Sequence, residues 1–164
     1  MSTLLSQPEV IRNALELGLG SVIKGYYLTG DPLKIPVANM PAVICLLESS
    51  SDDTGPTSQD LNSHTTIIKV VYNKKDDIGA SPTQDMTREK IRRLIEDRDG
   101  VTKQYLPNTI LGILRADYTF TGRFVLQSIS TKYDISIRLG MEDMTEEAEI
   151  TVRTKEYITI SNRV

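Results

Sequence analysis

The 164-residue chain has very few of the side chains on which enzymes and metal sites commonly depend. It contains one cysteine, one histidine and no tryptophan. A single thiol excludes an internal disulfide framework and a thiolate cluster as a metal site. Any Ser-His-Asp or Cys-His arrangement would have to use the one histidine, His64. We therefore predict a protein that is not an enzyme, with no catalytic residues, no cofactor and no metal site.

Basic charge and long apolar runs are also missing. The net charge is −3 and the pI is near 5.2, which argues against general affinity for nucleic acid. No run approaches the roughly 18 apolar residues of a membrane span, so no membrane partner is expected. The first residues lack a basic region, so we expect no signal peptide. A single cysteine fits a reducing compartment, typically the cytoplasm.

Two segments have the marks of helices. Ser6 and Glu9 form a capping box, and apolar residues then recur at helical spacing, which predicts a helix over about 7–25. The tetrapeptide 81–84 repeats the capping pattern before a second apolar stripe, which predicts a helix over about 83–98. A proline-containing extended connector is expected after the first helix.

The remaining apolar positions follow strand patterns. An uninterrupted apolar run predicts a strand buried on both faces, and alternation predicts strands with one wetter face. The stretch 122–131 fits either a strand or an irregular connection. The predicted strands cover residues 42–47, 64–72, 113–120, 133–139 and 148–160. We therefore expect a single α+β domain over residues 1–164, with a mostly antiparallel sheet and two main helices packed on one face.

The polar segment 48–63 separates two of the most apolar runs in the chain. We expect it to form a long polar loop at the tip of a hairpin. Loops of this length usually bind something or are disordered. No catalytic set exists for such a loop to cover, so we interpret it as a contact element for a neighbouring subunit, with an idle, disordered loop as the alternative. Its candidate contact residues are Ser51, Asp52, Asp53, Thr57, Gln59 and Asp60.

The strand predicted over 148–160 is a second candidate contact element. If this strand lies at a sheet edge, it can extend the sheet of a neighbour by backbone pairing. Its candidate contact residues are Ile150, Val152 and Ile158.

Other conspicuous residues have ordinary structural explanations. His64 falls on the apolar face of its strand, so we expect a partly buried strand histidine. Cys45 lies inside an apolar run and is expected to be inert. The carboxylates of 48–63 and 142–147 lack the spacing of a calcium loop, so we expect them to form a solvated acidic surface.

The order of these elements is more informative than any single motif. A capped helix leads to a strand opening with Pro41-Ala-Val-Ile44, and the polar insertion is followed by the strand Thr66-Ile-Ile-Lys-Val-Val-Tyr72. An arginine-rich helix and a β-rich region follow, and the last strand contains Glu156-Tyr-Ile-Thr-Ile160. Over most of the chain this layout resembles the tail terminator and head-tail joining (neck) proteins of long-tailed bacteriophages. The segments 48–63 and 140–147 are longer than the minimal domain of that family requires.

The resemblance implies a non-enzymatic structural protein of the virion, located in the tail or neck and assembled in the host cytoplasm. It implies a homo-oligomeric ring, a hexamer, that caps the tail tube and docks onto the head connector or another neck protein. DNA passes through the channel of such a ring without specific binding, and an acidic wall would repel it during passage.

Three other interpretations stay open. Another neck component, such as a connector-completion or stopper protein, would have a similar small α+β subunit. A small cellular ligand- or peptide-binding module would be monomeric, with a pocket beside Tyr26, Tyr27 or Tyr72. An enzyme would need His64 in a cleft with Asp60 or Ser63.

Overall fold

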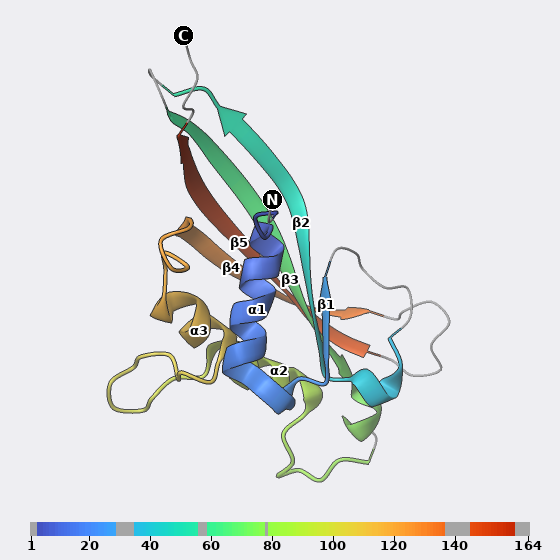
Figure 1. The fold of residues 1–164 in the computed structure, drawn as a ribbon. Coiled ribbons are helices and arrows are strands. Elements are labelled where there is room, and N and C mark those ends of the chain that lie inside the picture. Colours follow the sequence, from blue (N-terminus) through green and yellow to red (C-terminus); the bar gives the residue numbers. More distant parts are fainter. Residues whose placement is uncertain (1–2, 29–34, 56–58, 78, 137–144, 160–164) are drawn as a thin grey trace.

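A computed structural model describes residues 3–28, 35–55, 59–77, 79–136 and 145–159. It contains one five-stranded sheet with the strand order β1-β2-β3-β5-β4 (Figure 1). β1 runs parallel to β2, and the other neighbours are antiparallel. The strands are β1 (Gly25–Leu28), β2 (Ala42–Asp53), β3 (Gln59–Asn73), β4 (Val125–Ser136) and β5 (Thr145–Thr159). The helices are α1 (Gln7–Leu19), α2 (Thr87–Glu96) and α3 (Ile110–Ala116).

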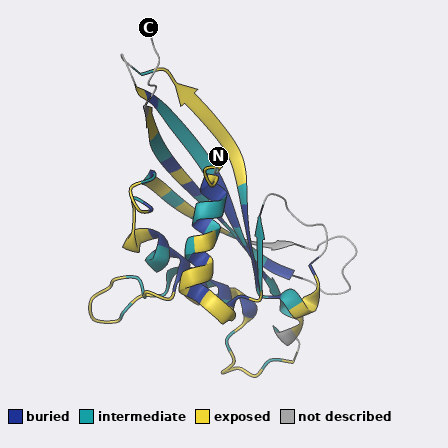
Figure 2. Cartoon of the chain, in the orientation of Figure 1, coloured by how far each residue is buried: buried dark blue, intermediate teal, exposed yellow. Residues whose placement is uncertain are grey.

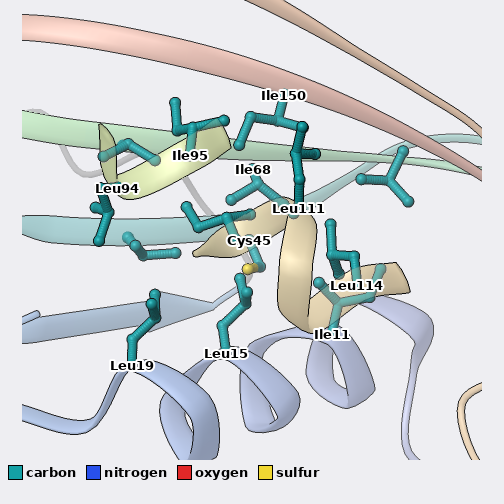
Figure 3. Packing of buried hydrophobic residues seen from close by; sticks show 14 of the residues in the cluster. Ile11, Leu15, Leu19, Cys45, Ile68, Leu94, Ile95, Leu111, Leu114 and Ile150 are labelled. Atoms are coloured by element: carbon teal, nitrogen blue, oxygen red, sulfur yellow. The ribbon is translucent and has the colours of Figure 1, made fainter. Parts of the chain in front are cut away.

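All three helices pack on one face of this sheet. Their buried side chains form a single core with the strand residues of that face (Figure 3). The members labelled in the figure are Ile11, Leu15, Leu19, Cys45, Ile68, Leu94, Ile95, Leu111, Leu114 and Ile150. The predicted α+β fold, with a mostly antiparallel sheet and helices on one face, is therefore confirmed.

The first helix begins where the sequence predicts and ends earlier. Ser6 Oγ accepts a hydrogen bond from the Glu9 amide at 3.4 Å, and Glu9 Oε2 accepts one from the Ser6 amide at 2.8 Å. Gly20, with a φ of +54°, ends α1 and leads through a 3₁₀ turn into β1. The prediction of a helix to residue 25 is therefore wrong, because the positive φ of Gly20 ends the helix, a 3₁₀ turn follows over Gly20–Val22, and β1 begins at Gly25.

The strand predicted over 113–120 is also wrong. Residues 110–116 form α3, and its N-cap Thr109 accepts a hydrogen bond from the Gly112 amide at 3.0 Å. Asp117 then binds the amides of Thr119 and Thr121, which starts a tight turn before β4. The sequence left the stretch 122–131 open between a strand and an irregular connection. β4 begins at Val125, so the stretch is a strand from that residue on.

The second helix is correct in place but shorter than predicted. It begins at Thr87 rather than at residue 83, and its cap comes from outside the tetrapeptide 81–84. Asp77 Oδ1 accepts hydrogen bonds at 2.8 Å from both the amide and the hydroxyl of Thr87. A carboxylate ten residues upstream therefore replaces the local capping box as the start signal of α2.

A buried ion cluster joins α2 to the beginning of β5. The side chain of Glu146 is only 2% exposed, yet it forms ion pairs with two cationic side chains. Its Oε2 accepts from Lys74 Nζ at 2.7 Å, and its Oε1 accepts from Arg88 Nε at 2.6 Å. These contacts fix η3 (Lys74–Asp77), α2 and β5 relative to one another.

Cys45 is fully buried in the main core. Burial raises the pKa of its thiol to about 12, so the thiolate is not formed near neutral pH. The expectation that Cys45 packs as a small buried hydrophobe is therefore confirmed, and an inert thiol is what this burial predicts.

Candidate functional site

The polar segment 48–63 is mostly β-strand, so the prediction of a long loop is wrong. β2 continues to Asp53 and β3 starts at Gln59, with Cα pairs running from Ser49 and Thr65 to Asp53 and Leu61. β5 pairs with the other edge of β3 throughout this region. The result is a three-stranded extension, which we call the arm: residues 49–53 of β2, 59–65 of β3 and 153–159 of β5. Figure 1 shows it projecting beyond the helices.

The shape of the arm follows from its pairing. β3 lies in the middle and has backbone partners on both sides. A register shift beside Glu48 marks the point where β2 leaves the body, and such bulges bend a strand. From Leu47 to Asp53 every β2 residue is exposed (Figure 2). The arm is therefore a pre-formed surface, and its docking costs less ordering entropy than that of a flexible loop.

The predicted contact residues of the polar segment have different environments. Ser51, Asp52 and Asp53 are exposed on β2, and Gln59 is exposed at the start of β3. Asp60 is buried, and its Oδ1 accepts a hydrogen bond from the Gly55 amide at 3.3 Å. Asp60 is therefore a structural residue of the hairpin and not a free contact. Thr57 lies outside the described residues.

The prediction for the C-terminal strand is wrong in two respects. Up to Lys155, β5 lies between β3 and β4, so only its last residues, 156–159, can lie at a sheet edge. Ile150 and Val152 are 0% exposed because the helices cover their face of β5, so neither is available as a contact. Ile158, beyond the helices, is 39% exposed and remains a candidate. Its neighbour Tyr157, which the sequence analysis missed, is 65% exposed.

The arm has two open edges among the described strands. β1 pairs with β2 only over residues 42–45, and β4 pairs with β5 only as far as Lys155. One edge is therefore residues 46–53 of β2, and the other is residues 156–159 of β5. These edges lie on opposite sides of β3, and each presents backbone groups that another strand can pair with.

A polar clasp holds the base of the arm against the body. Glu156 of β5 accepts a hydrogen bond from Gln7 Nε2 of α1 at 2.9 Å. Its other carboxylate oxygen pairs with Arg123 Nε at 3.3 Å, in the turn before β4. Glu156 and Arg123 are mostly buried, with side chains 15% and 19% exposed. The clasp therefore links the arm to α1 and to the turn before β4.

His64 lies at the base of the arm and is partly buried, as the sequence predicts. Its Cα partner on β5 is Thr154, and its Nε2 is buried with no hydrogen-bond partner among the described residues. Burial lowers the pKa of His64 from its ordinary 6.5, the carboxylate of Glu156 raises it, and the guanidinium of Arg123 lowers it. Burial is the largest of these effects.

The structure does not assemble the side chains that a His64-based enzyme would need. Ser63 is the adjacent residue on β3, so its side chain points to the opposite face of the sheet. Asp60 shares the face of His64 but lies four residues away, about 13 Å along an extended strand. Within the described ranges, no three His, Cys, Asp or Glu side chains gather as metal ligands.

The environment of His64 predicts a loss of stability in mild acid. The folded chain holds the pKa of His64 below its unfolded value of about 6.5, so the unfolded chain binds the proton more readily. Stability should fall as the pH drops through 6.5. His64 is the only histidine, so the difference between wild type and His64→Gln isolates its contribution. Between pH 7 and pH 5, urea unfolding should show a larger loss of unfolding free energy for wild type than for His64→Gln. Equal losses in the two proteins would contradict this explanation.

The chain matches no known protein family, and no curated protein is significantly similar to it. No helix in the described part of the chain is both long enough and apolar enough to cross a membrane.

Proposed function

We propose that this chain is a ring-forming structural subunit, a tail terminator that caps the tail tube of a long-tailed bacteriophage and joins it to the head connector. The observation that carries the proposal is the pre-formed arm with open edges on opposite sides. An enzyme or a simple binding module has no evident use for a stiff, polar, three-stranded projection. An assembly subunit needs such an element to reach its neighbour.

The asymmetry of the arm favours a closed ring over a simple dimer. The β2 edge and the β5 edge are different surfaces, so one copy can offer the first while the next offers the second. Contacts between unlike surfaces repeat from copy to copy, and they close into a ring when the rotation allows. The β2 edge bears Glu48, Asp52 and Asp53, so two β2 edges would repel each other. This charge pattern disfavours the symmetric alternative.

Acidity also fits the channel of such a ring. The chain has a net charge of −3, and six copies would multiply this value. A negatively charged wall weakens adhesion of DNA during passage. The tail tube protein and a neck or connector protein would be the axial partners of the ring.

Light scattering on the purified chain tests the proposal. The weight-average mass should rise with concentration from 18.3 kDa toward about six times that value. The same measurement should be repeated with isolated tail tubes, because some ring subunits close only on their partner. A chain that remains monomeric alone and does not bind tail tubes would contradict the proposal.

A further inference from the structure

An apolar groove lies between α1 and α3, on the outside of the helical layer. Its volume is about 460 Å³, within the usual range of binding pockets. Leu17 of α1, which lines it, is 90% exposed. The apolar residues around it are Val10, Ala14, Leu17, Ile113, Ala116 and Phe120. An isolated exposed leucine is common, but a hollow with several apolar walls marks an interaction site.

A pair of arginines lies next to this groove. The guanidinium carbons of Arg98 and Arg115 are 4.5 Å and 5.5 Å from the centre of the Tyr105 ring. Arg98 also donates a hydrogen bond to the Tyr105 hydroxyl at 2.8 Å. Both arginines are exposed, and neither has a carboxylate partner in the part of the chain described. Pro107, two residues after Tyr105, lines the groove, so the cations and the apolar walls belong to neighbouring surfaces.

The segment that presents these cations is pre-formed. Asp99 Oδ1 binds the amides of Val101 and Thr102, at 2.9 and 2.6 Å. Residues Arg98 and Tyr105 face each other across an isolated antiparallel bridge. Arginine and tyrosine held in fixed positions are typical of residues that dominate binding energy at interfaces.

The tip of the arm has the complementary chemistry. On β5 it exposes Tyr157 and Ile158, which point to opposite faces of the arm. Tyr157 lies in one cross-strand row with Leu61 and Asp53, so it can fill apolar space beside the carboxylate of Asp53. On β2 it exposes Asp52 and Asp53, and neither has an ion-pair partner among the described residues. The tip therefore combines apolar side chains with unpaired carboxylates, and the groove with the neighbouring Arg98 and Arg115 combines apolar walls with unpaired guanidinium groups.

We propose that the groove between α1 and α3, together with Arg98 and Arg115, receives the arm tip of an adjacent copy of this chain. The inference rests on the proposed ring and specifies its subunit contact. The chain's own arm tip lies at the far end of the sheet from the Arg98–Tyr105 segment, so the contact is made between copies (Figure 1). Donor and receptor are different surfaces, so every copy uses both and the contact propagates around the ring.

Charge reversal on each side tests this contact. The arm variant is Asp52→Lys/Asp53→Lys, and the receptor variant is Arg98→Glu/Arg115→Glu. Each variant alone opposes like charges at every contact, so its mass should fall from the ring to the 18.3 kDa monomer. An equimolar mixture should restore the ring, because each reversed arm then finds a reversed receptor and each native arm a native receptor. Restoration also shows that both variants are folded.

A matched control for the receptor variant is Lys24→Glu/Lys75→Glu, which makes the same charge change at two exposed lysines elsewhere. It should assemble as wild type does. Rings formed by either reversed variant alone, or a mixture that stays monomeric, would overturn this contact and leave the ring itself in place. A wild-type chain and a lysine control that both fail to assemble, with or without tail tubes, would overturn the proposed function and the contact with it.

Discussion

Replacing Lys74 and Arg88 together by methionine should destabilise the chain by about 3–5 kcal/mol, because it leaves the buried carboxylate of Glu146 without a counter-charge. Glu146 is 2% exposed, whereas Lys74 and Arg88 are 28% and 54% exposed. The cations can therefore reach water when their partner is removed, and the carboxylate cannot. Removing the cations should cost more than removing the carboxylate.

Glu146→Gln is the informative comparison. Its neutral amide remains buried and loses the charge-assisted bonds, for which we expect a cost of about 1–3 kcal/mol. Glu16→Gln, an exposed carboxylate on α1, is the control and should change stability by less than about 0.5 kcal/mol. Urea unfolding of the three variants gives the order of their losses in unfolding free energy. A larger loss for Glu146→Gln than for the methionine pair would contradict this description of the cluster.

Shortening the arm should abolish assembly while the body stays folded. Ser50 and His64 are Cα partners across the hairpin, so residues 51–63 can be replaced by a two-residue Asn-Gly turn without changing the register of the remaining strands. The variant loses the β2 tip and the pairing partner of the last β5 residues. Its main core lies below the cut and is unchanged.

We expect the shortened chain to be a folded monomer whose core is unchanged. Light scattering measures the mass, and the single cysteine reports on folding, because Cys45 is fully buried and should react with thiol reagents only after unfolding. Assembly of the shortened chain with Cys45 protected would contradict a role for the arm. Loss of assembly with a reactive Cys45 would indicate a damaged body, in which case Asp52→Lys/Asp53→Lys carries the test.

The parts of the fold that depend on local signals could be predicted from the sequence. The capping box at Ser6 placed α1, and the alternation around Ile150 placed β5. The strand prediction over 113–120 failed because the apolar side chains there fit both a strand period and a helix period. The Thr109 cap and the packing of Leu114 favour the helix. The short strand β1 was not predicted because its stability comes from pairing with β2, which no local sequence pattern shows.

The candidate site depended more strongly on long-range structure. Asp52 and Asp53 could be proposed as contacts from polarity alone, and both are exposed. Ile150 and Val152 could not be judged, because the sequence does not show that the helices cover their face of β5. The groove and its arginines escaped notice because they join side chains from α1, α3 and the segment before α3, and sequence spacing says nothing of that proximity.

Electron microscopy of particles from a phage strain lacking this gene tests the central claim most directly. If this chain closes the tail, such a strain should produce filled heads without tails beside free tails that are overlong or uncapped, and joined particles should return when the intact chain is supplied. The arm-shortened chain should fail to restore them. Normally joined, infectious particles in the absence of the gene would contradict the assignment of this chain to the end of the tail.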